Sequence, residues 1–145
     1  MKRDSRLSLV LHALLHMAER AEPVTSETLG ECLDANPVVV RRTMGLLRDA
    51  GFVHAGRGPA GGWSLAVALD RLSLLDLHNA LGQPAIFAMG NRSDAPDCRI
   101  EQAVNAAMGE SFAEAEALLL ARFAEITLAE LYQPFADHRS HETPR

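Results

Sequence analysis

The sequence predicts a mainly α-helical chain with a small β-hairpin, organised as a winged helix-turn-helix domain and a long C-terminal helix. Three observations indicate this fold class. Two short amphipathic segments are joined by a tight turn, and the second of them carries paired arginines. A glycine-rich segment between two short apolar runs follows at once. Further along, apolar residues recur at helical spacing over residues 110–132.

The first expected helix covers residues 5–21. It ends there because Pro23 disfavours the helical conformation in the residue before it. Thr25 or Ser26 is a good N-cap for a second helix over residues 27–33, and residues 34–36 form the turn. The inward-facing residues of the first helix are expected to be Leu7, Leu11, Leu14, Leu15 and Ala18.

The third expected helix starts at Pro37, which suits a first helical position because the backbone N–H there has no intrahelical partner. Gly51 lies where a glycine ends a helix. The arginines of this helix fall largely outside its apolar stripe, so they are expected to face solvent. The stripe consists of Val40, Met44 and Leu47.

A β-hairpin is expected directly after this helix. Its strands are residues 52–55 and 63–65, and the turn of residues 56–62 carries Arg57 near its tip. Phe52 and Trp63 are expected to pack this wing against the helices.

The second half of the chain is expected to be helical as well. Ser73 followed by Asp76 is an imperfect capping box and predicts a helix over residues 74–81. Residues 85–97 give the weakest signal, and helices over 98–108 and 110–132 precede a polar tail after Pro134. The expected division is a winged helix-turn-helix domain over residues 1–82, a dimerisation and sensor region over 83–135, and a flexible tail over 136–145.

The net charge of −5 is unevenly distributed. Residues 1–63 hold eight Lys and Arg against seven Asp and Glu, a balance of +1, whereas residues 64–145 hold six against twelve, a balance of −6. Within residues 36–63, four arginines face a single acidic residue, Asp49. A basic face on an acidic body still gives the electrostatic footprint of DNA binding, so double-stranded DNA is the predicted partner.

Other classes of protein are disfavoured. No apolar run reaches the ~20 residues of a membrane span, so no membrane partner is expected. The basic start followed by an apolar patch resembles a signal peptide, but His12, His16 and Glu19 interrupt it and no small-residue cleavage site follows. An amphipathic helix and a cytoplasmic protein are therefore expected. Nothing supplies a third metal ligand beside the two histidines, and no nucleophile–base–acid set indicates an enzyme.

The last long helix is expected to dimerise. At about 1.5 Å per residue its roughly 22 residues span about 33 Å, more than a small domain needs. A helix that is apolar around most of its girth needs a partner on both sides, and a second copy is the simplest. A two-fold homodimer would place two arginine helices in successive major grooves, with a buried helix in a monomer as the alternative. The expected dimer contacts are Phe112, Leu119, Phe123 and Ile126.

The hairpin segment, LLRDAGFVHAGRGPAGGWSLA, and the segment RLSLLDLHNALGQP that follows it carry a resemblance to a known family. With the order of elements from residue 5 to about residue 135, they resemble the Rrf2 family of bacterial transcription regulators, the kin of IscR, NsrR and CymR. The region CRIEQAVNAAMGESFAEAEALLLARFAEITLAEL resembles the cysteine and dimer-helix region of that family. The resemblance implies a homodimeric winged-helix protein that represses transcription at a palindromic operator.

The sequence departs from the cluster-binding members, which carry three closely spaced cysteines before the dimer helix. Here that region holds only Cys98, and one thiolate cannot hold a [2Fe–2S] cluster, which takes four protein ligands. Recruitment of His78 or His12, or a cluster shared across a dimer, is the alternative. The chain resembles the single-cysteine branch of the family, so no cofactor is expected.

The resemblance places Arg41 and Arg42 where the recognition helix faces the bases. Arginine reads guanine bidentately, so at least one of them is expected to contact a base, with solvated or phosphate-bound side chains as the alternative. Arg57 is expected to enter a narrow minor groove. Thr25 and Ser26 either contact a phosphate or cap a helix. The full predicted DNA-binding set is Thr25, Ser26, Asn36, Val38, Arg41, Arg42, Arg48 and Arg57.

Cys98 lies at an expected helix start, where the helix N-terminus and Arg99 favour the reactive thiolate and Asp97 opposes it. A redox or electrophile sensor and an idle surface thiol both remain open. Cys32, beside Leu29, is expected to be a small core residue.

The leading hypothesis is a dimeric repressor released by modification of Cys98. A small-molecule-gated regulator and a protein-interaction adaptor that has lost DNA binding are the alternatives. The ligand pocket of the gated regulator would lie near Ile86, Phe87 and Met89.

Overall fold

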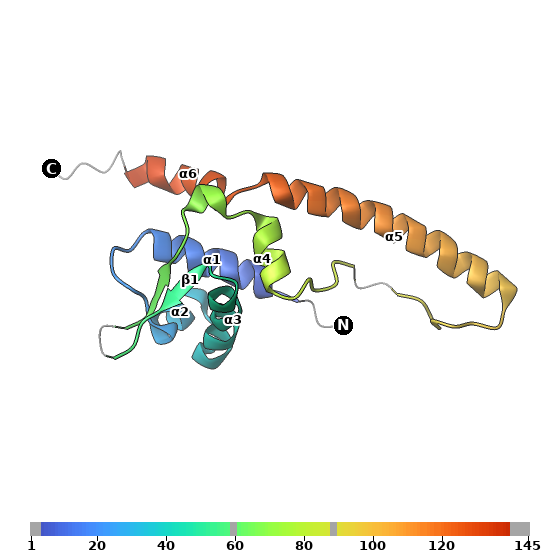
Figure 1. Cartoon of the computed structure of the whole chain (residues 1–145), viewed down its shortest axis with the longest axis horizontal. Coiled ribbons are helices and arrows are strands. Elements are labelled where there is room, and N and C mark those ends of the chain that lie inside the picture. The colour runs from blue at the N-terminus through green and yellow to red at the C-terminus, as the bar shows by residue number, and fades with distance from the viewer. Residues whose placement is uncertain (1–3, 59–60, 88–89, 140–145) are drawn as a thin grey trace.

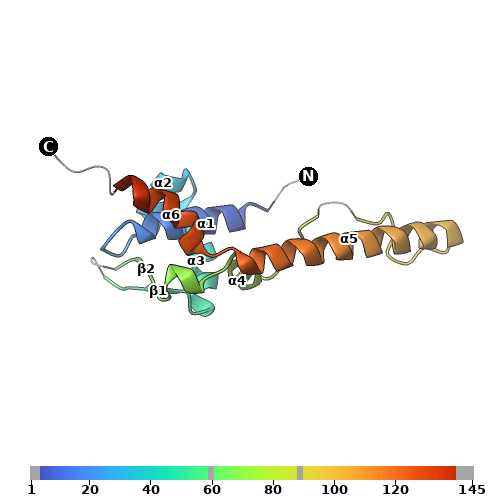
Figure 2. The ribbon, with the colours of Figure 1, turned by 90° about the horizontal axis from the view of Figure 1, so that it is seen from above.

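The computed structural model of the chain describes residues 4–58, 61–87 and 90–139. Short helices and a hairpin form a body from which one long helix, α5, extends (Figure 1, Figure 2). The loop before α5 runs out along that helix, and α5 returns to the body (Figure 1). The elements are α1 (Arg6–Ala18), α2 (Ser26–Leu33), α3 (Pro37–Asp49), β1 (Val53–Ala55), β2 (Trp63–Leu65), a 3-10 turn η1 (Leu69–Arg71), α4 (Leu74–Ala80), α5 (Arg99–Glu125) and α6 (Leu128–Arg139).

The predicted fold class, mainly helical with one hairpin, is confirmed. Helices α2 and α3 form the helix-turn-helix, and each begins at a side-chain cap. Thr25 Oγ1 accepts a hydrogen bond from the N–H of Thr28 at 3.1 Å, and Asn36 Oδ1 accepts one from the N–H of Val38 at 2.8 Å. Gly30 lets the turn close tightly, because a Cβ there would lie 2.7 Å from the carbonyl oxygen of Ala35.

The hairpin is held to the body by a third extended segment. Strands β1 and β2 are antiparallel, with Val53 opposite Leu65. On the other side of β2, Val24 and Trp63 exchange backbone hydrogen bonds of 2.9 and 2.8 Å. Gly62 makes this approach feasible, since its φ is +147° and a Cβ there would lie 2.8 Å from the backbone of Val24.

The core lies where α1, α3, α4 and the hairpin meet. The predicted stripe of α3 is confirmed, since all three of its members are fully buried, and Trp63 is buried as expected. The buried apolar residues that pack as one cluster are Val10, Ala13, Leu14, Met17, Val24, Leu29, Val40, Met44, Leu47, Val53, Trp63, Leu72, Leu77, Leu81 and Leu128.

The prediction of two helices over residues 98–108 and 110–132 is wrong, because residues 99–125 form the continuous helix α5. Gly109 does not interrupt it. A glycine within a helix costs only about 0.5–1 kcal/mol, which the hydrogen bonds on both sides outweigh. Pro134 likewise lies inside α6 and does not end it.

The break falls instead at residues 126–127, which pair with the segment before α4. The N–H of Leu74 donates to the carbonyl of Ile126 at 3.0 Å, and the N–H of Leu128 donates to that of Leu72 at 2.9 Å. These long-range bonds satisfy the backbone in an extended conformation, so α5 ends and α6 turns back. Helix α6 then packs against η1 and α1, with Leu128 in the core (Figure 1, Figure 2).

Several local expectations have clear outcomes. The capping box is confirmed, since Ser73 and Asp76 exchange hydrogen bonds of 2.9 and 3.1 Å. Cys32 is exposed, not a core residue, because the buried face of α2 is centred on Leu29 and Gly30. Helix α1 ends at Ala18, before the expected residue 21.

Some predicted features lie outside the described residues, namely Met89 and the end of the tail from residue 140. Among the residues that are described, no helix is long and apolar enough to cross a membrane.

Candidate nucleic-acid interface

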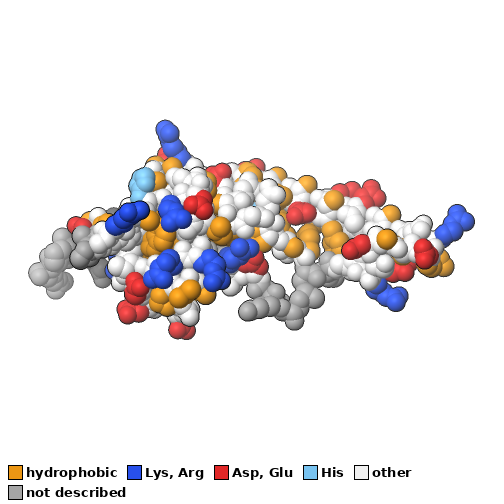
Figure 3. Space-filling view, turned by 60° about the horizontal axis from the view of Figure 1, so that its bottom comes forward, with side chains coloured by type: hydrophobic (Ala, Val, Ile, Leu, Met, Phe, Trp, Pro, Cys, Tyr) orange, Lys and Arg blue, Asp and Glu red, His pale blue; other side chains and the backbone are white. Residues whose placement is uncertain are grey.

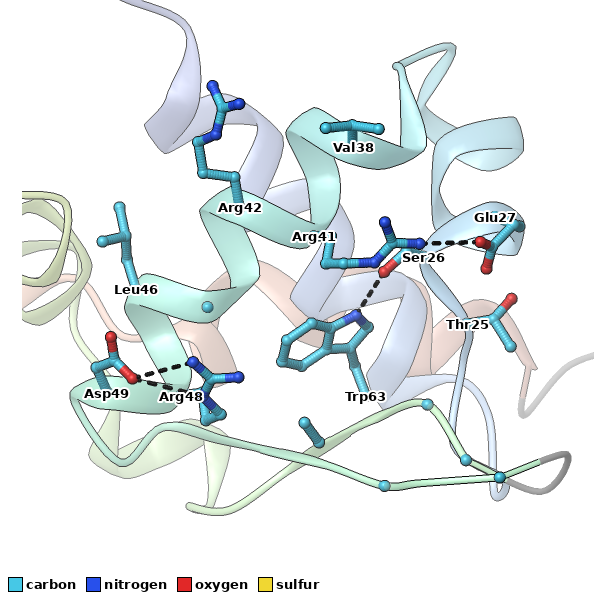
Figure 4. Close-up of a pocket in the computed structure, with 16 residues that line it drawn as sticks. Thr25, Ser26, Glu27, Val38, Arg41, Arg42, Leu46, Arg48, Asp49 and Trp63 are labelled. Atoms are coloured by element: carbon cyan, nitrogen blue, oxygen red, sulfur yellow. Dashed lines mark hydrogen bonds and ion pairs between the residues drawn. The ribbon is translucent and has the colours of Figure 1, made fainter.

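An open groove of about 690 Å³ lies between the start of α2, helix α3 and the hairpin. Basic side chains gather on this part of the body (Figure 3). The close-up shows side chains from all three elements directed toward the groove (Figure 4). The lining residues are Thr25, Ser26, Glu27, Val38, Arg41, Arg42, Gly45, Leu46, Arg48, Asp49, Ala55, Gly56, Gly58, Gly61, Gly62 and Trp63.

The structure brings the three predicted arginines of α3 to this groove, but in different electrostatic states. Arg41 Nη2 lies 3.0 Å from Oε1 of Glu27 on α2, and Arg48 Nη2 lies 3.3 Å from Oδ1 of Asp49, its neighbour in sequence. Arg42 is exposed and makes no ion pair within the described part of the chain. Figure 4 shows Arg42 directed away from Arg41 along the same helix.

Ser26 has a role that the sequence did not indicate. Its side chain is buried, and its Oγ accepts a hydrogen bond from Nε1 of Trp63 at 2.8 Å. This bond joins the start of α2 to the wing, beside the backbone pair of Val24 and Trp63, so both contacts hold the two sides of the groove together. A buried tryptophan needs an acceptor for its N–H, but residues 26 and 63 are too far apart in sequence for this rule to name the partner.

Thr25 and Asn36 lie at the N-termini of α2 and α3, respectively, and their side chains cap those helices. Their oxygens accept the bonds described above, and the Thr25 hydroxyl also donates to Oγ1 of Thr28 at 3.0 Å. Both residues are exposed. Thr25 lines the groove, whereas Asn36 lines a separate depression at the turn between α2 and α3. The start of α2 therefore presents backbone N–H groups at the groove, where such groups favour anions.

The start and middle of α3 present a partly apolar surface. Val38 is 53% exposed and Val39 is 43% exposed, although both are large apolar residues. A Cβ at Gly45 would meet only Arg48 Nη2, at 3.8 Å. Packing within the body therefore does not require a glycine at this position, and the helix surface there stays open to a close approach from outside.

Arg57 extends from the wing next to glycines that shape the turn. It is exposed, and Gly58 beside it has a φ of +80°. The N–H of Gly56 donates to the carbonyl of Gly62 at 2.8 Å, which closes the wing below its tip. The tip residues 59–60 lie outside the described residues.

Cys98 is exposed at the start of α5, far along the chain from the groove. It borders a cavity of about 470 Å³ between α5 and the preceding loop. Side chains of α5 tie that loop down, because Gln102 Nε2 donates to the carbonyl of Pro96 and Asn105 Nδ2 donates to that of Ser93, both at 2.9 Å. The structure does not bring the other cysteine, Cys32 on α2, into this cavity.

The histidines of α1 line a separate, smaller cavity. His12 and His16 face it together with Glu19, which follows α1, and Tyr132 of α6, and its volume is about 160 Å³. Across the described residues, no three His, Cys, Asp or Glu side chains lie close enough to hold a metal ion.

The predicted dimer residues are all half-buried by their own chain. Phe112 stacks on Phe87 of the loop with ring centroids 5.5 Å apart, and Phe123 meets His78 of α4 edge-on at 6.3 Å. The expected ligand slot near Phe87 is thus filled in part by Phe112. The exposed large apolar residues of α5, none of them among the four expected dimer contacts, are Ile100, Val104 and Leu118.

Comparison with known proteins relates this chain to a family of transcriptional regulators. A profile of the Rrf2 family, described as iron-dependent transcriptional regulators, matches residues 3–134. YwnA of Bacillus subtilis, named as an HTH-type transcriptional regulator, is 31% identical over 110 residues, which are 75% of this chain and 80% of YwnA.

Solved structures share the fold over almost the whole chain. A transcriptional regulator from Lactobacillus plantarum superposes with a TM-score of 0.75 at 27% identity, covering 94% of this chain and 91% of that one. CymR of B. subtilis, named as its global cysteine regulator, gives a TM-score of 0.67 at 18% identity, covering 92% and 97%. IscR of T. potens gives 0.64 at 18% identity, covering 100% and 93%.

Proposed function

Because the chain belongs to the Rrf2 family of DNA-binding transcriptional regulators, we propose that it represses transcription as a homodimer bound to a palindromic operator. Members of this family, and the matched relative, are regulators and not enzymes. The observation that carries the proposal is the open groove in which the arginines of α3, the start of α2 and the glycine wing converge.

In this proposal α3 reads bases in the major groove. Arg41 and Arg42 supply the planar donors that match guanine O6 and N7, and each good pair contributes roughly 1–3 kcal/mol of discrimination. The exposed methyl groups of Val38 and Val39 suit thymine methyls. Gly45 lets the helix approach the base edges without an intervening side chain.

The surrounding residues position the protein on the backbone. The N-termini of α2 and α3, with Thr25 and Asn36, suit phosphate oxygens, and Arg48 adds a positive charge at the other end of α3. The Ser26 side chain is buried, and its hydroxyl accepts the Trp63 N–H, so we assign its backbone N–H rather than its side chain to DNA. Arg57 on the wing suits a narrow minor groove.

The dimer would form through α5. Its 27 residues extend about 40 Å at 1.5 Å per residue, and none of them is buried in the single chain. Ile100 and Leu118 are 18 residues apart, which is five full turns, so with Val104 they lie on one face. We call these three residues the α5 ridge. Its exposed position makes it a better dimer surface than the four residues expected from the sequence.

The family is described as iron-dependent, but the residues around Cys98 do not fit an iron–sulfur cluster. A cluster takes four protein ligands, and the cavity beside Cys98 supplies one thiolate. His78 is buried in edge-on contact with Phe123 and does not line the cavity beside Cys98, so it does not supply a second ligand there. The proposed function therefore includes no step that involves a cluster.

Cys98 supports a second element of the proposal, a response to oxidants. The thiol is exposed, lies at a helix N-terminus and borders a cavity that could admit a small molecule. If oxidation of this thiol releases DNA, peroxide lowers operator affinity in the wild type but not in Cys98→Ser. An identical response in both proteins would exclude the thiol as the sensor.

The central experiment is footprinting on the chain's own promoter region, together with anisotropy titrations over a series of salt concentrations. A palindromic footprint and a steep salt dependence are expected, because each neutralised phosphate releases counterions. Arg41→Ala with Arg42→Ala should remove site preference, whereas Arg57→Ala should weaken binding. A footprint that survives all three changes, or a protein that ignores DNA at low salt, would contradict the proposal and favour an adaptor.

A further inference from the structure

The ion pair between Glu27 and Arg41 stands out among the charges of the groove. It joins two separate helices across 14 positions of sequence, whereas Arg48 pairs with its immediate neighbour and Arg42 with no carboxylate in the described chain. Figure 4 shows the Arg41 guanidinium directed toward the Glu27 carboxylate at the edge of the groove. Both residues line the surface that the proposed function assigns to DNA.

Stability does not account for this pair. The side chains of Arg41 and Glu27 are 56% and 64% exposed, and an ion pair exposed to this degree contributes little to folding because water and salt screen it. A carboxylate in a DNA-binding groove also repels phosphates. A carboxylate at this position must therefore either weaken DNA binding without benefit or improve something other than affinity.

The geometry points to the second option: we infer that Glu27 is a positioning residue that makes Arg41 read a base in place of a phosphate. This inference rests on the proposed function. A guanidinium has five N–H donors in one plane. The contact with Glu27 engages one nitrogen, Nη2, and the other donors stay available to guanine.

Glu27 has opposite effects on the two kinds of complex. On a matching site, Arg41 is already oriented and meets guanine with the Glu27 contact retained, so less side-chain freedom is lost on binding. On any other sequence, Arg41 would have to leave Glu27 to reach a phosphate, and the bared carboxylate would face the DNA backbone. Specificity is the difference between these two affinities. Glu27 increases it by favouring the complex with a matching site and by disfavouring the complex with any other sequence.

The test compares Glu27→Gln with Glu31→Gln in the full-length protein. Glu31 lies one turn further along α2, is exposed, and does not line the groove, so the control removes the same charge from the same helix. The probes are a duplex that the wild type selects from a random pool and a scrambled duplex of the same composition. Both are titrated by anisotropy over a range of salt concentrations.

For Glu27→Gln, affinity for the scrambled duplex should rise by about two- to fivefold, the range of an exposed ion pair. Its salt dependence should steepen by about 0.9 in logarithmic slope, the value for one added phosphate contact. Affinity for the selected duplex should stay the same or fall, so the ratio between the two duplexes decreases. In Glu31→Gln, both affinities should change by one common factor and leave the ratio unchanged.

An Arg41→Gln background provides the decisive control, because there Glu27→Gln should behave like Glu31→Gln. The inference is overturned if Glu27→Gln shifts both duplexes equally while the wild type still selects a sequence. If the wild type selects no duplex at all, the proposed function itself fails. The two failures are therefore distinguishable.

Discussion

The body and helix α5 differ in whether their apolar residues are buried within the single chain. The body buries a continuous cluster of apolar residues drawn from α1, α2, α3, α4, α6, the hairpin and the segments between them, and no member of this cluster lies on α5. Helix α5 is the longest element, yet none of its residues 99–125 is buried. The body is therefore complete within one chain. Helix α5 leaves an apolar ridge facing solvent, and this contrast is the physical basis for assigning it to a second copy.

The largest effect should come from charging the α5 ridge. Ile100→Glu combined with Leu118→Glu places repelling carboxylates in the proposed dimer contact, so the protein should become monomeric by light scattering. Its affinity for a selected palindromic duplex should fall roughly 10²–10⁴-fold, because the second half-site no longer binds within the same molecule.

The matched control is Ala113→Glu, which adds a carboxylate to another exposed side of α5. It should leave both the mass and the affinity unchanged. A double variant that stays dimeric and binds DNA normally would show that the ridge is not the dimer surface. The exposure of α5 would then give no reason to assign it to a second copy.

The next prediction compares the stability cost of truncating two leucines, one in the core of the body and one on the surface of α5. Leu47 is fully buried and Leu118 is 75% exposed. Leu47→Ala should lower the free energy of unfolding by about 2–5 kcal/mol, since it leaves a cavity in the core. Leu118→Ala should change it by less than about 0.5 kcal/mol, as measured by urea unfolding at a dilution where the protein is monomeric. Equal losses in the two variants would mean that α5 is buried by its own chain.

A smaller effect is expected at the bond between Ser26 and Trp63. Trp63→Phe removes the N–H donor and also shrinks the buried ring system, whereas Ser26→Ala removes only the acceptor. Ser26→Ala should lower the free energy of unfolding by about 1–3 kcal/mol, because it leaves a buried N–H without a partner, and Trp63→Phe carries an added cavity cost. In the Trp63→Phe background, Ser26→Ala should cost little more, because the bond is already absent. The mass in solution should not change, since the bond belongs to the body. Fully additive losses would argue that the hydrogen bond contributes nothing to stability.

The smallest effect uses one glycine from each region. Gly45 lies in α3 and Gly109 in α5, and neither would meet packed atoms if it gained a Cβ. Both Gly45→Ala and Gly109→Ala should stabilise their helices by up to about 1 kcal/mol. Only Gly45→Ala should weaken DNA binding, because its methyl group faces the proposed base-reading surface. Unchanged binding in Gly45→Ala would remove the argument for a close approach of α3 to DNA.

Much of the body was predictable because its signals are local. Thr25 and Ser73 cap helices through bonds to residues three positions away, and such short motifs are visible in the sequence. The stripe of α3 and the glycine-rich wing are likewise patterns within one short segment. The proposed DNA contacts Arg41 and Arg42 followed from the resemblance of these segments to the recognition helix of the Rrf2 family.

The predictions that failed gave too much weight to single residues and to their neighbours in sequence. Gly109 and Pro134 were weighted as breaks, yet the helices continue through both. Cys32 was placed in the core because of its neighbours in sequence, although its side of α2 faces solvent. On a helix, a shift of one position turns a side chain by about 100°, so nearness in sequence to a buried leucine does not ensure burial.

By itself, the sequence determined the winged helix-turn-helix, its caps and the position of its arginines, because a few neighbouring residues specify each of these features. The tertiary structure decided the rest. It ended α5 at Ile126 through backbone bonds to the segment before α4, and it turned Phe112 and Phe123 inward. It also brought Ser26 to Trp63 and Glu27 to Arg41, since both pairs depend on how separate elements dock and not on any spacing along the chain.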